Sequence, residues 1–297
     1  MKHKHTSSTP RIKKVGIIAK VNIKESAAYL KTLVTALQTY TKDILFDENS
    51  AAVMGEKSYE NTAILSRAQL VIVLGGDGTL LKTARHMSLK RPIIAGVNMG
   101  NLGFLTAFTM KSILKNIPNI FAGNVCPDER LLLRVTLYRN GKKHFTHLAL
   151  NEVVINQGGF ARLIKLLVEV NQRELANYQA DGLIISTPTG STGHALSAGG
   201  PIIHPKIDGL VLTPLCPIKL SMRPIIIPND RQITIKLETE WREGKKPIVL
   251  TLDGQITTNL KRGDVIRVRK SRRTMNMIRM SGHNYYRMLR KKLNWGA

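Results

Sequence analysis

The sequence predicts two domains: an α/β N-terminal domain with a parallel, doubly wound sheet, and a β-rich, sandwich-like C-terminal domain. Two observations predict this division. Strand-like and helix-like patterns alternate up to residue 125, whereas strand-like patterns follow one another beyond it, with almost no helix signal before residue 284. Alternating strands and helices are typical of a parallel sheet covered on both faces. The 297 residues, 43% of them hydrophobic, are enough for two such cores.

The first domain is expected at residues 14–125, after a basic, polar leader of residues 1–13 that we expect to be disordered. From Leu30 to Leu37, apolar residues recur at the i, i+3, i+4 and i+7 spacing of one helix face. A second helix pattern covers residues 111–121. Short apolar runs typical of buried strands occupy residues 15–19, 44–46, 70–74 and 93–97.

The pattern changes near Cys126, and the β-rich domain is expected at residues 126–275. Residues 131–138 alternate toward Asn140-Gly141, a dipeptide typical of a type I′ hairpin turn, and residues 142–150 form the return strand. Further strand patterns occupy residues 163–170, 181–187, 209–215, 232–237, 248–252 and 265–268.

The C-terminal segment, residues 276–297, carries a helix pattern at residues 284–293 that we expect to return to the α/β domain. The protein has a net charge of +25, from 45 Lys and Arg against 20 Asp and Glu, and basic residues concentrate toward this end. Such a field attracts polyanions, which include nucleotides and nucleic acids. Aromatic residues make up only 5% of the chain, so stacking platforms for single strands are few. We therefore expect no specific nucleic-acid binding.

The composition also argues against membrane and disulfide-rich classes. No apolar run approaches the roughly 20 residues that a membrane-spanning helix needs, and the leader lacks the apolar region of a signal peptide. The two cysteines, Cys126 and Cys216, stand far apart and make neither a disulfide framework nor a zinc site. These observations favour a reducing, cytoplasmic location without membrane association.

The strongest local signal is GGDGT at residues 75–79, between an apolar strand and a helix-like run. Ligands of open α/β sheets bind at the carboxyl ends of strands, and glycines there let backbone N–H groups surround phosphate oxygens. The chain has neither a Walker A motif nor GxGxxG. The alternative interpretation is an ordinary strand-turn-helix junction in which Asp77 caps the helix.

A second signal begins at Asp181, where a buried strand leads into a segment rich in Thr, Ser and Gly. Small hydroxyl residues suit a ligand pressed against main chain, although a tight structural loop is the alternative. Asn151-Glu152 could hold the hydroxyls of a ribose or simply begin a turn. Likewise, residues 252–255 make a plausible β-turn.

Taken in order, these motifs resemble those of NAD kinases over nearly the whole chain. They are GGDGT at 75–79, NMGNLGFL at 98–105, Asn151-Glu152, DGLIISTPTGST from Asp181, SAGGPI at 197–202, LTPLCP at 212–217, Asp253-x-Gln255 and the ending YYRMLRKKLNW. The resemblance implies transfer of a phosphoryl group from ATP to the 2′-hydroxyl of the adenosine ribose of NAD. GGDG by itself also occurs in diacylglycerol kinases and phosphofructokinases, so the ordered set carries the resemblance.

By this resemblance, Asp77 is the general base and also contacts NAD. The remaining NAD contacts that it implies are Gly78, Phe104, Asn151, Glu152, Arg162, Gln179, Asp181, Thr192, Gly193, His194, Ala195, Leu196, Ser197 and Gln255. The phosphate-binding residues are Gly75, Gly76, Gly78 and Thr79.

With ATP or polyphosphate as donor, we expect Mg²⁺ or another divalent cation to enter with the phosphates, because the sequence shows no dedicated protein metal site. The resemblance also implies a homodimer or homotetramer. Three positions depart from the pattern: many relatives have Ala-Tyr at Gly193-His194, Arg at Gln179 and His at Ile218. A diacylglycerol-type lipid kinase and a nucleic-acid-binding protein are the rival functions, and an assay of NAD against lipid phosphorylation distinguishes the kinases.

Overall fold

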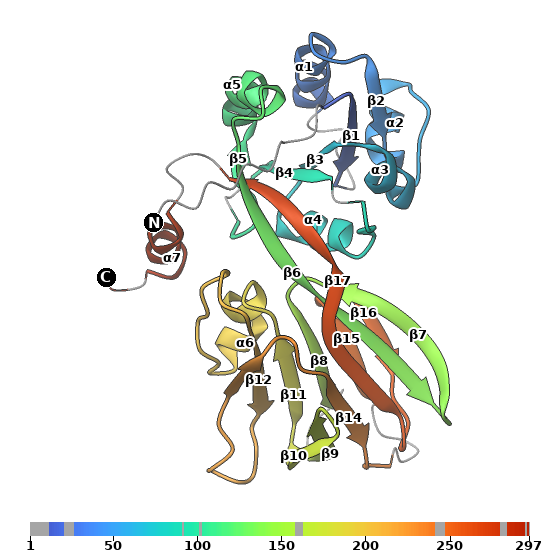
Figure 1. Cartoon of the computed structure of the whole chain (residues 1–297), viewed down its shortest axis with the longest axis vertical. Helices are drawn as coiled ribbons and strands as arrows, with labels where there is room; N and C mark the ends of the chain where they lie inside the picture. The colour runs from blue at the N-terminus through green and yellow to red at the C-terminus, as the bar shows by residue number, and fades with distance from the viewer. Residues whose placement is uncertain are drawn as a thin grey trace. The chain divides into compact units, whose positions relative to one another are not determined.

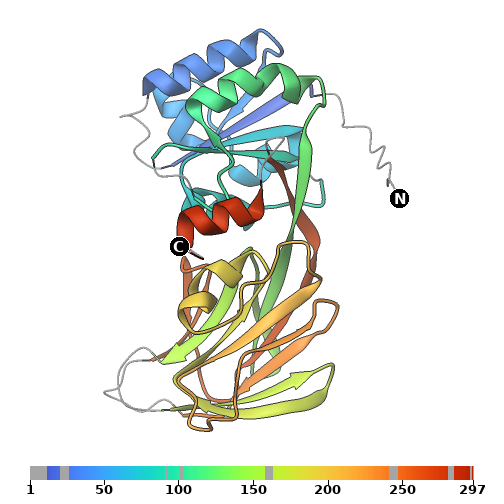
Figure 2. The ribbon, with the colours of Figure 1, turned by 90° about the vertical axis from the view of Figure 1, so that its left-hand side faces the viewer.

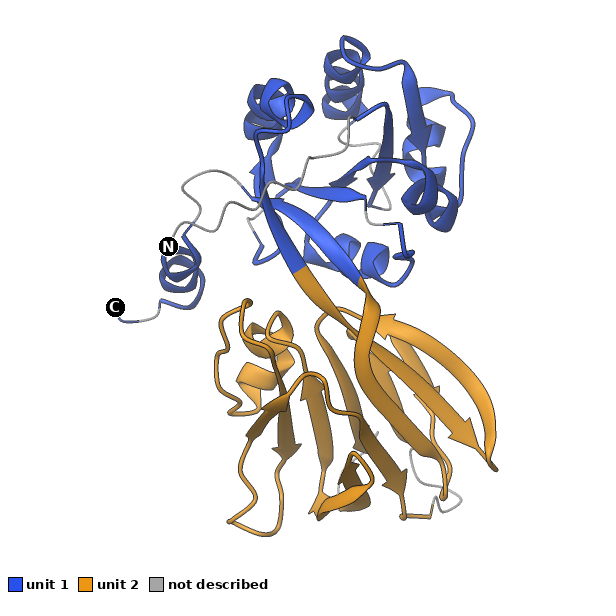
Figure 3. Ribbon diagram, in the orientation of Figure 1, with its two compact units in different colours: residues 1–129, 274–297 blue, residues 130–273 orange. Residues whose placement is uncertain are grey.

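The computed structural model describes residues 12–20, 27–90, 92–100, 103–157, 163–240, 247–279, 284–294 and 296. The chain divides into two compact units, residues 1–129 with 274–297 and residues 130–273 (Figure 3). Two long strands cross this division, β6 (Cys126–Arg139) and β17 (Val265–Arg279). The first unit is therefore built from both ends of the chain.

The first unit contains the expected parallel sheet. Its strands lie in the order β2 (Asp43–Phe46), β1 (Lys14–Ala19), β3 (Leu70–Leu74) and β4 (Ile93–Asn98), and all run parallel (Figure 1). The outer side of β4 pairs with the end of β17 and with the short β5 (Phe108–Thr109). The strand order reverses between β1 and β3, the position at which sheets of this kind bind ligands.

Helices cover both faces of this sheet, as a doubly wound fold requires. On one face, α1 (Ala27–Gln38) and α5 (Met110–Phe121) lie side by side (Figure 2). Leu33 of α1 and Ile117 of α5 share an apolar core with Ile17 and Ile72 of the strands. The helix pattern predicted at residues 111–121 is therefore confirmed.

The opposite face packs against α3 (Asn61–Arg67) and α4 (Asp77–Ala84). A Cβ atom at Gly16 would lie 2.2 Å from Ile64 of α3, and one at Gly96 would lie 2.8 Å from Leu80 of α4. These strand positions must remain glycine because the helices approach so closely. The unit also contains α2 (Glu48–Met54) and the C-terminal α7 (Tyr285–Leu293).

The second unit is a sandwich of two β-sheets. One sheet has the order β13-β12-β11-β8-β15-β16, and the other joins β10, β9, β14 and β17 with the β6–β7 hairpin. Leu183 and Leu250 from the first sheet share a core with Val168 and Ile266 from the second. The additional strands are β7 (Lys142–Ala149), β8 (Glu152–Gln157), β9 (Ile164–Val170), β10 (Arg173–Ala180), β11 (Gly182–Ser186), β12 (Gly209–Leu215), β13 (Ile225–Pro228), β14 (Ile233–Leu237), β15 (Ile248–Leu252) and β16 (Ile256–Asn259).

Some strands differ from the sequence predictions. The β6–β7 turn at Asn140-Gly141 has φ values of +50° and +73°, which confirms the type I′ hairpin signal. In contrast, β17 is much longer than the predicted residues 265–268, because it continues through the exposed basic residues of the segment that follows. The mostly polar strand β10 was also missed, since it lacks a continuous apolar face.

Candidate functional site

The GGDGT loop connects the end of β3 to the start of α4. Gly75 donates its backbone N–H to the carbonyl of Val97 at 2.9 Å. A Cβ atom at this position would lie 2.3 Å from Thr79 Oγ1 and 3.3 Å from Lys20 Cβ. Gly76 and Gly78 are exposed. The loop thus presents bare backbone at the carboxyl edge of the sheet, beside a lysine and the start of a helix, which suits phosphate oxygens.

Asp77 binds a neighbouring segment of main chain. Its carboxylate accepts backbone N–H groups from Phe104 at 2.8 Å, Leu105 at 3.1 Å and Thr106 at 3.3 Å. Gly103 passes so close that a Cβ atom there would lie 1.9 Å from Asp77 Oδ1. An ionised carboxylate has about four acceptor positions, so these three bonds leave one for an external hydroxyl. The half-buried side chain is compatible with that access.

The segment that Asp77 holds is also fixed from its other side. The buried Asn98 donates from Nδ2 to Thr106 Oγ1 at 3.1 Å, and the same hydroxyl accepts the N–H of Gly103 at 2.9 Å. The half-buried Phe104 lies within this segment. Its position is therefore set by polar contacts from the ends of both β3 and β4.

In the second unit, Asn151 and Glu152 stand where β8 begins, and a second carboxylic acid, Asp253, fixes their backbone. Asp253 accepts the N–H groups of Leu150 and Asn151, each at 2.8 Å, and that of Glu152 at 3.0 Å. Its own N–H donates to the carbonyl of Glu152 at 3.0 Å. Asp253 is 5% exposed and has a φ of +49° in the turn between β15 and β16.

The side chains of Asn151 and Glu152 carry buried oxygens that lack partners. Asn151 Oδ1 and Glu152 Oε2 have no hydrogen bond within the described part of the chain. Burial, followed by the nearby Asp253 carboxylate, raises the pKa of Glu152 to about 7. An unpaired buried polar group costs about 1–3 kcal/mol, so a ligand that offers hydroxyl groups would relieve this cost.

The TPTGST segment packs directly on this pair. Thr187 donates its hydroxyl to the carbonyl of Leu150 at 2.6 Å and its N–H to that of Asn151 at 2.8 Å. A Cβ atom at Gly190 would lie 2.3 Å from the Asn151 carbonyl oxygen, and one at Gly193 would lie 3.3 Å from Glu152 Oε2. Gly193 therefore faces the unpaired side chain of Glu152.

The residues after Gly193 form the short helix α6 (His194–Ser197). Ala195 is buried, Thr192 and Leu196 are half-buried, and His194 and Ser197 are exposed. Two further polar residues of this unit hold the site in place, and their roles were not predicted from the sequence. Asp253 was placed in a turn and in the Asp253-x-Gln255 motif without a role of its own, and the buried Arg130 donates to Thr189 Oγ1 at 2.9 Å. The Asp253-Gly254 dipeptide, typical of a turn, and the Asp253-x-Gln255 motif were the sequence signals for the first.

The other predicted residues are held mainly by their backbones. Gln179 accepts the N–H of Ile218 at 3.0 Å, so two of the departures from the NAD kinase pattern are in direct contact. The N–H of the exposed Asp181 donates to Leu215 at 2.9 Å, and that of the exposed Gln255 donates to Leu252, also at 2.9 Å. Arg162 lies outside the described residues.

The second unit brings together Asn151, Glu152, Gly193 and Asp253. The first unit brings together Asp77 and Phe104. Among the described residues, no group of three or more His, Cys, Asp or Glu side chains could hold a metal ion. None of the described helices is long and apolar enough to cross a membrane.

Comparisons with known proteins agree with the geometry. Residues 15–125 match the family model of the ATP-NAD kinase N-terminal domain, and residues 150–280 match that of the C-terminal domain. The chain is 41% identical over 286 residues to the NAD kinase of Geotalea daltonii, covering 96% of this chain and 99% of that one. It is 39% identical over 292 residues to the NAD kinase of Ralstonia nicotianae, covering 97% and 95%.

Two solved structures share the fold. A yeast NADH kinase complexed with NADH has a TM-score of 0.88 at 23% identity, covering 97% of this chain and 89% of that one. An NAD kinase from Archaeoglobus fulgidus in complex with ATP has a TM-score of 0.70 at 21% identity, covering 95% and 98%. The combination of a parallel α/β unit and a β-sandwich is therefore shared with these enzymes.

Proposed function

The chain belongs to the NAD kinase family and phosphorylates NAD to NADP with ATP, and we propose that Asp77 is the general base of this transfer. The observation that carries the proposal is the carboxylate of Asp77, which stands within a glycine loop and keeps one acceptor position beside its three backbone hydrogen bonds. Phosphoryl transfer depends mainly on positioning the reactants and neutralising charge. A carboxylate beside the hydroxyl would supply the one further requirement, which is removal of the hydroxyl proton.

In the proposed step, the 2′-hydroxyl of the adenosine ribose gives its proton to the carboxylate of Asp77. The ribose oxygen forms a bond to the γ-phosphorus while the bond to the leaving ADP oxygen breaks. We propose that the loop of Gly75, Gly76, Gly78 and Thr79 surrounds the phosphate oxygens at the start of α4. The N–H of Gly75 is donated to the carbonyl of Val97 and that of Thr79 to Gly76, so these two residues shape the loop. The donor enters as its complex with Mg²⁺ or another divalent cation, which neutralises phosphate charge through the phosphates and water.

We propose that Asn151 and Glu152 hold hydroxyl groups of NAD. Their unpaired buried oxygens support this role, because ribose hydroxyls would supply the missing donors. The further NAD contacts that we propose are Gly78, Phe104, Arg162, Gln179, Asp181, Thr192, Gly193, His194, Ala195, Leu196, Ser197 and Gln255.

We also propose a cytoplasmic homo-oligomer, a dimer or a tetramer. Strand β13 lies at the edge of its sheet and exposes Ile225 and Ile226, while Leu220 in the preceding loop is 82% exposed. Exposed apolar side chains on an open edge strand are typical of an association surface. Light scattering of the purified protein measures the oligomeric state, and a monomer at micromolar concentration contradicts this proposal.

The experiment that tests the function is a coupled assay of NADP formation with purified protein, NAD and Mg-ATP. Parallel reactions with diacylglycerol separate it from a lipid kinase. Inorganic polyphosphate in place of ATP determines the donor range. Absence of NADP from folded protein, with several divalent metals tried, would overturn the function.

A further inference from the structure

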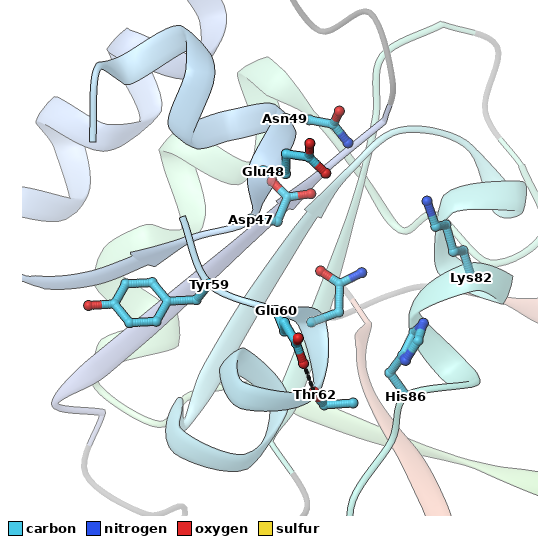
Figure 4. Close-up of a pocket in the computed structure, with 9 residues that line it drawn as sticks. Asp47, Glu48, Asn49, Tyr59, Glu60, Thr62, Lys82 and His86 are labelled. Carbon is cyan, nitrogen blue, oxygen red and sulfur yellow. Dashed lines mark hydrogen bonds between the residues drawn. The ribbon is translucent and has the colours of Figure 1, made fainter. Parts of the chain in front are cut away.

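The first unit contains a cavity of about 270 Å³ whose wall is formed almost entirely by polar side chains (Figure 4). Its contributors come from three places in the chain: the start of α2, the segment that leads into α3, and the polar side of α4 with the residues that follow it. The side chains that line it are Asp47, Glu48, Asn49, Tyr59, Glu60, Asn61, Thr62, Lys82 and His86.

The cavity lies at the same edge of the parallel sheet as the GGDGT loop, the edge formed by the carboxyl ends of the strands. Asp47 directly follows β2, and the loop directly follows the parallel strand β3, so both stand at carboxyl ends. Lys82 is five residues beyond Asp77 on α4, which corresponds to about 7.5 Å along the helix axis. A molecule whose phosphates occupy the loop could therefore extend along α4 into the cavity.

Asp47 and Asn49 in the cavity wall already have hydrogen-bond partners within the protein, so a ligand would bind to other side chains. The buried Asp47 carboxylate accepts the N–H groups of Ala19 at 3.1 Å and Ser50 at 3.0 Å, and Asn49 Nδ2 donates to the carbonyl of Ala19 at 3.0 Å. In contrast, Glu48 and Lys82 are exposed and make no ion pair with each other. Both remain available to an incoming molecule.

Glu60 and His86 indicate which chemical groups the cavity could bind. The carboxylate of Glu60 contacts only the hydroxyl of Thr62 among the cavity side chains, at 3.3 Å, and both residues are exposed. Burial and the positive charges of Arg85 and Lys82 lower the pKa of His86, and the negative charge of Glu60 opposes this shift only in part. A neutral imidazole carries one donor and one acceptor, which matches the polar edge of a nucleobase.

From this arrangement we propose that the cavity binds the nucleoside part of the phosphoryl donor, with Glu48 and Glu60 accepting ribose hydroxyls and Lys82 contacting the phosphate chain. The inference rests on the proposed function for the identity of the donor. The volume is near the lower end of the range for small-molecule sites, so it suits a nucleoside rather than a whole nucleotide. Carboxylates commonly bind ribose hydroxyls in doubly wound folds, whereas a lysine suits phosphate.

The decisive variant fills the cavity without touching the loop. Thr62→Trp places a bulky ring at an exposed position of its wall, and Thr32→Trp on the exposed side of α1 is the matched control. We expect Thr62→Trp to raise the KM for ATP at least about 10-fold with the KM for NAD unchanged, the signature of lost donor binding. Inhibition by inorganic tripolyphosphate, which has no nucleoside, should stay unchanged.

A second, milder variant guards against misfolding. Glu60→Gln keeps the size of the side chain and should raise the KM for ATP several-fold, while Glu56→Gln, outside the cavity, should not. Calorimetric titration with ADP should show the same weakening. If wild-type protein forms NADP but Thr62→Trp and Glu60→Gln keep its KM for ATP, the cavity is not the donor site. If wild-type protein forms no NADP, the proposed function itself fails, and the ADP titration alone decides the role of the cavity.

Discussion

Asp77 and Asp253 make the same kind of contact in two different units, yet their surroundings differ. Each carboxylate accepts three consecutive backbone N–H groups, from residues 104–106 and residues 150–152 respectively. Asp77 is half-buried within a glycine loop, whereas Asp253 is 5% exposed beneath the start of β8. The hydrogen-bond pattern alone therefore does not identify a base. The proposed base, Asp77, differs from Asp253 in its access to solvent.

The largest expected effect concerns Asp77. The change Asp77→Asn keeps the size of the side chain but removes its ability to accept a proton, so kcat should fall by about 10²–10⁴. Steady-state assays of NADP formation measure the fall, and calorimetry should show that NAD still binds. The melting temperature serves as control, because the amide cannot accept all three N–H groups as the carboxylate does. A variant with near wild-type kcat would assign the base elsewhere.

The next largest effect separates the two carboxylates by stability. Asp253→Ala leaves buried N–H groups without partners and should lower the free energy of unfolding by about 4 kcal/mol. Asp77→Ala should cost less, about 1–2 kcal/mol, since water can reach the groups that it exposes. Urea denaturation of both variants measures the difference. Equal losses would mean that access to solvent does not distinguish the two positions.

Glu152 sharpens the comparison through pH. Its pKa is raised from 4.5 to about 7 in the folded protein, so the folded state holds the proton more tightly than the unfolded state. Its contribution to stability is therefore fully present below pH 4.5 and is lost as the pH rises toward 7, by about 3 kcal/mol in total. Glu152→Gln should remove this loss, and unfolding of both proteins between pH 4.5 and 8 measures it. Parallel profiles would show that Glu152 titrates normally.

The smallest expected effect is at Gly193. A Cβ atom there would lie 3.2 Å from the Gly190 carbonyl oxygen and 3.3 Å from Glu152 Oε2, distances that small movements can relieve. Gly193→Ala should therefore change the KM for NAD by less than about 3-fold, an effect below 1 kcal/mol. Gly103→Ala is the contrasting variant, because its Cβ atom would lie 1.9 Å from Asp77 Oδ1. Activity should survive the first change and fall sharply with the second.

The sequence predicted the periodic parts of the molecule better than the polar contacts. Continuous apolar runs such as residues 70–74 identified the parallel strands, because burial on both faces leaves no polar alternation. The role of Asp253 could not be read in this way, since its partners lie about 100 residues away in the chain. Nor could the sequence indicate that Asp77 would hold residues 104–106, which depends on how two neighbouring strands end.

The pairing of β17 with β4 has a consequence for synthesis on the ribosome. Residues Asn276 and Met277 join the parallel sheet beside Ile93 and Ile94, so this edge of β4 stays open until nearly the whole chain has been made. Arg279 and Asp128, which form an ion pair, are also far apart in the order of synthesis. Domains commonly fold as they emerge, N-terminal first. Here the N-terminal unit completes its sheet only when the C-terminal end of β17 has been made, because until then Ile93 and Ile94 have no partner on the outer edge of β4.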